Sequence, residues 1–181
     1  YSSAASDVYK RQLQGRHIVI VGAGSIGKHI ASTARAFGMR VTGISRTGVH
    51  SDEFDRVTTI DALTEVLKDA NYLISVLPDT PNTQGIIDAG ALAALPNDSM
   101  LINIGRGNTL DHDALVTALK NGDLRRAVID VFPNEPLPID SPLWSISNLT
   151  ITPHISAVSF PKDIARIFLH NLKKYERGEP L

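Results

Sequence analysis

The stretch His17 to Lys28, HIVIVGAGSIGK, constrains the fold of this chain more than any other part of the sequence. Four apolar residues, Ile18 to Val21, run directly into a turn with glycine at three positions, and an amphipathic run follows at once. This order predicts a strand, a glycine turn and a helix, which is the structural context that a GxGxxG motif needs to bind a dinucleotide.

Each glycine of this turn has its own physical role. Gly22 lets the chain turn sharply, Gly24 lets the backbone approach a pyrophosphate, and Gly27 lets the helix pack closely on the strand. The phosphates are expected on the free N–H groups at the start of the helix, at Ser25 and Ile26. A GxGxxG motif alone is weak evidence, so the flanking strand and helix carry this prediction.

Composition limits the class of protein. A length of 181 residues allows one good-sized core and a fragment of a second domain, and 43% hydrophobic with 20% charged residues is typical of a globular protein. The net charge of -1 gives no field that would attract nucleic acid or an anionic membrane. The chain has no cysteine for disulfides and no apolar run as long as a membrane span. We therefore expect a cytoplasmic protein.

The first residues need a separate interpretation. Ser2 to Gln12, SSAASDVYKRQ, reads as the translation of a transposon-end adapter used to prepare sequencing libraries. We interpret residues 1–12 as a non-native, adapter-derived scar. The alternative is a polar N-terminus without a fixed structure.

Strand and helix signals alternate along the rest of the chain. Apolar runs bounded by turn residues predict strands at 18–21, 40–44, 56–59, 72–77, 100–104, 127–131 and 149–152. Helical spacing predicts helices at 25–37, after an Asp61 cap, at 91–95, after Asp111 or Asp113, and at 161–177. This alternation predicts an α/β fold, a doubly wound parallel sheet of the Rossmann type, over residues 13–160.

Ligands of such sheets bind beyond the carboxyl ends of the strands. The unusual residues of this sequence follow or close strands, and one crevice is able to hold them all: Gly22, Ser45, Arg46, Leu77, Pro78, Gly105, Arg106, Asp130 and His154.

The end of the second strand indicates which dinucleotide binds. NAD-selective sites usually place Asp or Glu there to accept hydrogen bonds from the ribose 2′-OH, but this chain has Ser45, Arg46 and Thr47. A guanidinium with two neighbouring hydroxyls offers charge-assisted donors to a 2′-phosphate. We therefore favour NADP(H) and keep NAD(H) as the alternative, in which Arg46 is a solvated loop residue.

Three charged or titratable residues at strand ends suit a 2-oxo acid. Arg106 can hold its carboxylate bidentately, His154 as imidazolium can give a proton to the carbonyl oxygen, and Glu135 can hold the second imidazole nitrogen. On the residues alone, a single histidine is more often structural or exposed, and loop Arg and Glu are mostly solvated.

A resemblance supports the catalytic interpretation. GAGSIG, LPDTPNTQGII, LINIGRG, VIDVFPNEPLP and ITPHIS, in this order, resemble the D-2-hydroxyacid dehydrogenase family over Leu13 to Leu181. The resemblance implies catalytic roles for Arg106, Glu135 and His154. It also implies contacts on the nicotinamide side of the cofactor at Leu77, Pro78, Thr83, Ile104, Gly105 and Asp130.

Two shorter motifs point to a branch of this family. SRT after the second strand and SPLW at Ser141 to Trp144 resemble the NADPH-linked glyoxylate/hydroxypyruvate reductase A branch. The expected substrate is then a small 2-oxo acid, reduced to its D-2-hydroxy acid.

The resemblance also implies a missing part. Family members build a substrate domain from the N-terminal part of the chain and a short C-terminal return, so this chain is expected to be a fragment that lacks that domain. Residues 161–181 would lead to the hinge with their docking surface partly bare. We expect the fragment alone to bind a dinucleotide weakly and hardly to turn over, and the full-length protein to be a homodimer.

Other functions stay open. A dinucleotide-sensing corepressor of the C-terminal-binding-protein type shares the fold and the Arg, Glu, His set, but predicts NAD and an acidic residue near Ser45. A third alternative is a nucleotide-binding module without chemistry. No metal site is expected, because the remaining histidines are scattered without ligand spacing: His17, His29, His50, His112 and His170.

Overall fold

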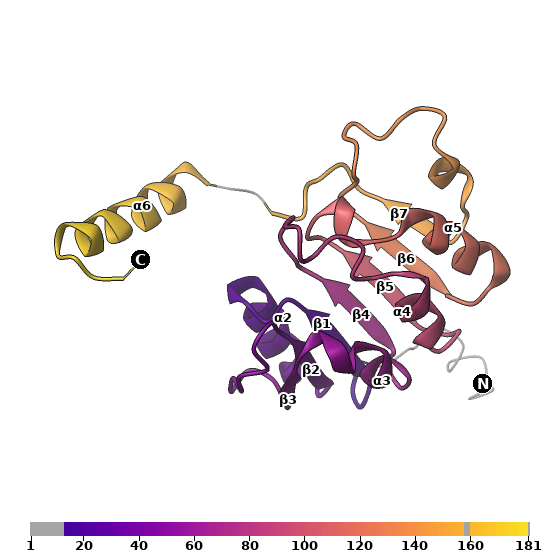
Figure 1. Ribbon diagram of the computed structural model, residues 1–181, viewed down its shortest axis with the longest axis horizontal. Helices are drawn as coiled ribbons and strands as arrows, with labels where there is room; N and C mark the ends of the chain where they lie inside the picture. Colours follow the sequence, from indigo (N-terminus) through magenta and orange to yellow (C-terminus); the bar gives the residue numbers. More distant parts are fainter. Residues whose placement is uncertain (1–12, 158–159, 181) are drawn as a thin grey trace, which may run out of the picture.

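A seven-stranded parallel sheet forms the centre of the computed structural model, which describes residues 13–157 and 160–180. The strand order is β3-β2-β1-β4-β5-β6-β7, and every neighbouring pair is parallel (Figure 1). The strands are β1 (His17–Val21), β2 (Arg40–Ile44), β3 (Arg56–Thr58), β4 (Tyr72–Ser75), β5 (Met100–Asn103), β6 (Arg126–Ile129) and β7 (Leu149–Ile151). The predicted Rossmann sheet is thereby confirmed. The segment interpreted as a scar, residues 1–12, lies outside the described residues.

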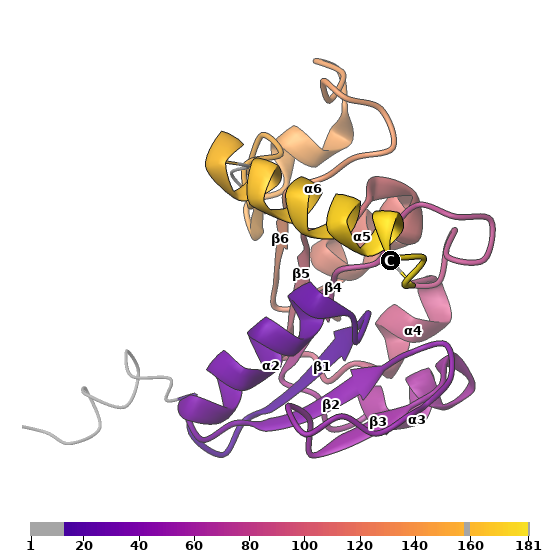
Figure 2. The same cartoon turned by 90° about the vertical axis from the view of Figure 1, so that its left-hand side faces the viewer.

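Helices lie on both faces of the sheet, as Figure 2 shows from the side. On one face α2 (Ser25–Ala36) packs through Ala31 and Ala34 on Ile18 and Ile20 of β1. The other face carries α3 (Leu63–Leu67), α4 (Ala89–Ala94) and α5 (His112–Asn121), whose apolar side chains join Val19 and Val21 in one core. Successive β1 residues thus serve opposite faces, which explains why this strand is apolar throughout.

The buried stripe of α2 consists of small residues. Gly27, Ala31 and Ala34 are buried, whereas Ile26 and Phe37, which also fall at helical spacing, are exposed. Small side chains let the helix lie close to the sheet. The face of α2 that packs on the sheet is therefore the one with the smallest side chains, and not the one with the largest apolar residues.

Several element ends differ from the sequence prediction. Asp61 does not cap a helix: Thr59 precedes the 3₁₀ turn η1 (Ile60–Ala62), and Ala62 precedes α3, neither with a side-chain cap. Asp111, and not Asp113, caps α5 by accepting from the Ala114 N–H. The strand expected to reach residue 77 ends at Ser75, although the Val76 N–H still donates to the Val21 carbonyl at 3.0 Å.

The last helix, α6 (Pro161–Glu176), stands away from the sheet in Figure 1. The described helix buries no residue, and its apolar side chains are exposed, among them Ile164, Ile167, Phe168 and Leu172. The predicted amphipathic helix is therefore present, with its apolar face uncovered. No helix in the described part of the chain is both long and apolar enough to cross a bilayer.

Candidate active site

The glycine turn after β1 has the geometry that the motif predicts. Gly22 has φ +112°, a conformation that L side chains rarely adopt, and a Cβ there would lie 2.8 Å from Val76 Cγ2. A Cβ on Gly27 would lie 2.0 Å from the carbonyl oxygen of Gly22, so only glycine allows α2 to start this close to the turn. A Cβ on Gly24 would meet nothing within 4 Å, because this position faces open space.

The start of α2 fits the phosphates of a dinucleotide. Gly24 is the N-cap, and no side chain caps the helix. Ser25 and Ile26 in the first turn are exposed, and the N–H groups of a first helical turn have no partner within the helix. An uncapped helix N-terminus beside an open glycine is a cradle for an anion.

The loop after β2 presents its cationic side chain to solvent. Ser45 is anchored at both ends, because its N–H donates to the Thr58 carbonyl at 2.9 Å and its Oγ accepts from the Gly48 N–H at 3.0 Å. Arg46 and Thr47 are exposed. This loop therefore places an exposed guanidinium beside the edge where the glycine turn lies.

The segments after β4 and β5 lie side by side. A Cβ on Gly105 would lie 2.6 Å from the Leu77 carbonyl oxygen, and the Ile104 N–H donates to the Ser75 carbonyl at 3.1 Å. Thr83 folds back on the same segment, where its Oγ1 donates to the Pro78 carbonyl at 2.6 Å. The structure thus gathers the predicted nicotinamide-side residues of these segments, and their contact with a cofactor stays a prediction.

His154 and Glu135 form a close pair at the neighbouring edge. His154 Nδ1 lies 2.8 Å from Glu135 Oε2, and the other carboxylate oxygen accepts from the Phe132 N–H at 2.9 Å. The hydrogen bond from His154 and that from Phe132 lower the pKa of Glu135, with a contribution from the charge of Arg106. Among the described residues, Nε2 of His154 has no hydrogen-bond partner, and 49% of the side chain is exposed.

Asp130, at the end of β6, organises the turn that carries His154. Its carboxylate accepts hydrogen bonds from the Thr152 hydroxyl and from the N–H groups of Ile155 and Ser156, and its carbonyl accepts from the His154 N–H at 3.0 Å. Burial opposes the charge of this carboxylate, but these donors outweigh it and lower its pKa to about 2. His154 itself has φ +54°, so the Asp130 carboxylate stabilises a turn that a β-carbon disfavours.

Arg106 follows β5 on the same edge. Its side chain is exposed, and Nη1 donates to the Gly105 carbonyl at 2.7 Å. A Cβ on the adjacent Gly107 would lie 2.0 Å from the Phe132 carbonyl carbon, and the Phe132 N–H donates to Glu135, so the turn that carries Arg106 lies against the segment that holds the His154 pair. The three predicted catalytic residues therefore share one region, although they are far apart in the sequence.

Sequence reasoning missed the buried polar residues behind this region. Asn103 and Thr109 are fully buried next to Arg106, and Thr152 supports Asp130. A signal was present, because Asn103 interrupts an otherwise apolar strand, and a polar residue in a buried strand needs partners.

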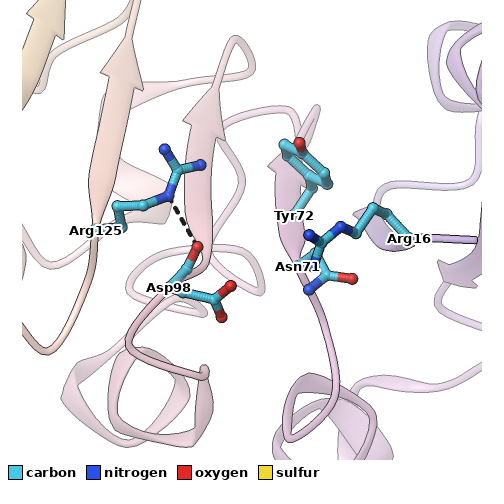
Figure 3. Close-up of a pocket in the computed structure, with 5 residues that line it drawn as sticks. All are labelled: Arg16, Asn71, Tyr72, Asp98 and Arg125. Atoms are coloured by element: carbon cyan, nitrogen blue, oxygen red, sulfur yellow. Dashed lines mark hydrogen bonds between the residues drawn. The ribbon is translucent and has the colours of Figure 1, made fainter. Parts of the chain in front are cut away.

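A shallow hollow lies at the opposite edge of the sheet (Figure 3). It is at the amino ends of the strands and is lined by Arg16, Asn71, Tyr72, Asp98 and Arg125. The Arg125 Nε donates to the Asp98 carbonyl at 2.9 Å. Because the glycine turn lies at the other end of β1, this hollow is separate from the candidate active site.

Comparisons with known proteins point to one family. Residues 2–156 match the family described as D-isomer specific 2-hydroxyacid dehydrogenase, NAD binding domain. A glyoxylate/hydroxypyruvate reductase A of Klebsiella pneumoniae (strain 342) is 35% identical over 162 residues, which are 90% of this chain and 52% of that protein. The chain thus spans about half the length of the curated relatives it matches.

Solved structures show the same likeness. A D-isomer specific 2-hydroxyacid dehydrogenase family protein from Aeromonas salmonicida has 47% identity and a TM-score of 0.87, over 94% of this chain and 55% of that chain. A D-isomer specific 2-hydroxyacid dehydrogenase from Xanthobacter autotrophicus Py2, in complex with NADPH and MES, has 33% identity and a TM-score of 0.88, over 96% and 72% of the two chains.

Proposed function

The chain belongs to the D-isomer specific 2-hydroxyacid dehydrogenase family, as an NAD-binding domain, and on that premise we propose that the complete protein is an oxidoreductase acting on a small 2-oxo acid. The observation that carries the proposal is the His154–Glu135 pair, with its Nδ1–Oε2 distance of 2.8 Å and its outer nitrogen unoccupied by any described group. An imidazole held at one nitrogen and open at the other is suited to proton transfer.

Each residue of the pair and Arg106 has a distinct task. Nε2 of the protonated His154 gives its proton to the carbonyl oxygen of the substrate, while Glu135 holds Nδ1–H and stabilises the imidazolium. Arg106 binds the substrate carboxylate, and its charge polarises the adjacent carbonyl. A bound nicotinamide dinucleotide supplies the hydride that reaches the carbonyl carbon. The product is the D-2-hydroxy acid, with the proton from His154 on its oxygen.

NADP(H) is the proposed dinucleotide, with NAD(H) as the alternative. Support comes from the exposed Arg46 and Thr47 beside Ser45, which can donate to a 2′-phosphate, and from the relative solved with NADPH. A carboxylate at this position would repel that phosphate.

Glyoxylate and hydroxypyruvate are the proposed substrates. The relative from Klebsiella pneumoniae is named for both compounds, and both carry the carboxylate and adjacent carbonyl that Arg106 and His154 require. The alternative of a dinucleotide-sensing corepressor predicts binding without turnover, so an assay of turnover separates the two.

The remainder of the protein is proposed to close the site. Relatives are about twice as long as this chain. Two apolar parts of the chain are not fully buried: the apolar face of α6 is exposed, and Ile102 of β5 is only partly buried on the side of the sheet where α2 lies. We propose that residues 13–160 form the dinucleotide-binding domain and 161–181 lead into a hinge with a substrate domain. A homodimer in the cytoplasm is the proposed state, checked by sedimentation and cell fractionation.

The test compares the intact protein with the 181-residue chain. NADPH and NADH are titrated separately, and a panel of 2-oxo acids is assayed for NADPH oxidation. We expect turnover by the intact protein, loss of turnover with retained NADPH binding in Arg106→Ala, and very low turnover by the chain alone.

Arg126→Ala is the matched control, because Arg126 is exposed at the amino end of β6. Full activity of Arg106→Ala, or absence of turnover with every 2-oxo acid, would contradict the proposed function.

A further inference from the structure

Behind Arg106 lies a cluster of polar side chains that the proposed chemistry does not use. Ser75 at the end of β4, Asn103 at the end of β5 and Thr109 in the 3₁₀ turn η2 (Gly107–Thr109) are all fully buried. Buried polar groups are costly unless they are hydrogen-bonded, so the partners of this cluster show what it stabilises.

Asn103 bridges two peptide groups of the turn that carries Arg106. Its Oδ1 accepts from the Gly105 N–H at 3.1 Å, and its Nδ2 donates to the Arg106 carbonyl at 3.2 Å. One buried side chain therefore fixes the main chain on both sides of the Gly105–Arg106 peptide.

Thr109 holds the same carbonyl from the other side. Its Oγ1 donates to the Arg106 carbonyl at 2.7 Å, and its N–H donates to the same oxygen at 3.3 Å. The Ser75 hydroxyl lies 3.5 Å from Thr109 Oγ1, which ties the cluster to β4. The Arg106 carbonyl thus accepts from two side chains and one backbone group.

The glycines on either side of Arg106 leave the turn no room to move. A Cβ on Gly105 would lie 2.6 Å from the Leu77 carbonyl oxygen, and a Cβ on Gly107 would lie 2.0 Å from the Phe132 carbonyl carbon. The turn is therefore wedged between the segments after β4 and β6. Phe132 also donates its N–H to Glu135, so the turn packs against the segment that holds the His154 pair.

We propose that Asn103 and Thr109 are positioning residues for Arg106, and this inference rests on the proposed function. The guanidinium is exposed, and within the described residues its one hydrogen bond goes to the adjacent Gly105 carbonyl, so its place relative to Glu135 and His154 is set by its main chain. The buried cluster fixes that main chain. A misplaced guanidinium would bind the substrate carboxylate less well, whereas the dinucleotide site at Gly24 would be unaffected.

Thr109 offers a matched pair of variants for the test in the intact protein. Thr109→Val keeps the shape and removes the hydroxyl, whereas Thr109→Ser keeps the hydroxyl. We expect Thr109→Val to raise the KM for glyoxylate about tenfold, the effect of losing roughly one hydrogen bond, with the Kd for NADPH unchanged. Thr109→Ser should stay within about twofold of the wild type. Asn103→Leu should act like Thr109→Val, and thermal unfolding of each variant shows whether it is folded.

A double-mutant cycle separates positioning from a merely structural role. If Thr109 acts through Arg106, Thr109→Val should change the Kd for glyoxylate, measured by binding in the presence of NADP⁺, less than about twofold in an Arg106→Ala background. Equal effects in both backgrounds, or an unchanged KM in Thr109→Val, would overturn the proposal.

A readout without turnover keeps this inference separate from the proposed function. The NMR signal of the Arg106 Nε–H, assigned by its loss in Arg106→Ala, should shift in Thr109→Val and not in Thr109→Ser. If the wild type oxidises no NADPH with any 2-oxo acid, the proposed function fails, and this signal still decides the positioning role. An Arg106 signal that is the same in Thr109→Val and the wild type would refute it.

Discussion

Two imidazole–carboxylate pairs lie at opposite edges of the same sheet. At the carboxyl edge His154 Nδ1 is 2.8 Å from Glu135, and at the amino edge His17 Nδ1 is 2.9 Å from Asp69. The difference lies in the second nitrogen. Nε2 of His17 is 2.9 Å from the Thr42 hydroxyl and the side chain is 5% exposed, whereas the His154 side chain is 49% exposed.

The same chemical pair therefore serves two purposes. Burial lowers the pKa of His17, with a further effect from Arg40 and against the opposing effect of Asp69. The ring links β1, β2 and the loop before β4 through hydrogen bonds. His154 instead keeps one nitrogen open to a ligand. A histidine beside a carboxylate indicates a proton-transfer role only where its second nitrogen remains accessible.

Substituting each histidine separately tests whether His154 serves catalysis and His17 serves stability. His154→Gln in the intact protein should lower kcat by about 10²–10⁴-fold, the range for a lost general acid, with little change in thermal stability. His17→Gln should leave kcat within about twofold and lower stability instead. Steady-state kinetics and thermal unfolding measure both. Comparable kcat losses in the two variants would contradict the distinction.

A substitution at Asp130 tests whether a residue at the carboxyl edge also stabilises the fold. Its pKa of about 2 lies below its ordinary value of 3.8, so its charge stabilises the fold above about pH 4, and that contribution is lost as the pH falls toward 2. Asp130→Asn should cost about 2 kcal/mol at neutral pH and progressively less below pH ~4, measured by urea unfolding across this range. Asp140→Asn, in an exposed loop, is the control. A cost that is the same at every pH would show that the charge is not involved.

His17 tests the structural pair itself. Its pKa is lowered in the folded protein, so the unfolded chain binds more protons near the ordinary value of 6.5, and stability falls as the pH decreases through that value. His17→Gln should cost about 1 to 2 kcal/mol at pH 7 through unpaired partners, and should flatten this pH dependence. Chemical unfolding between pH ~7.5 and ~5 measures it, with the exposed His29→Gln as the control. A slope equal to that of the wild type would argue against a neutral, buried His17.

The smallest expected effect concerns the arginines of the two edges. Arg46→Ala should weaken NADPH binding about tenfold, as for one charge-assisted contact at an exposed site, and leave NADH binding unchanged. Arg16→Ala, in the hollow at the amino edge, should change neither. Fluorescence titration measures the dissociation constants. Equal weakening of both dinucleotides by Arg46→Ala would remove the proposed contact with the 2′-phosphate.

Much of the fold could be read from the sequence, because it depends on local patterns. The glycine spacing after Val21 requires a strand, a turn and a helix in close contact, and the alternation of elements requires parallel strands with crossovers. The exact ends were less predictable. Asp61 looks like a cap in the sequence, but the 3₁₀ turn before α3 places Thr59 and Ala62 at the cap positions instead.

The sequence by itself determined which edge of the sheet collects the chemically useful residues, since every parallel strand ends at the same side. Only the tertiary structure decided which histidine keeps its second ring nitrogen accessible to a ligand. His17 and His154 each flank or follow an apolar strand in the sequence, and nothing local reveals that Thr42 covers one ring while the turn held by Asp130 exposes the other. The partners lie 25 or more residues away or in a turn of unusual conformation, so packing, and not local preference, selects them.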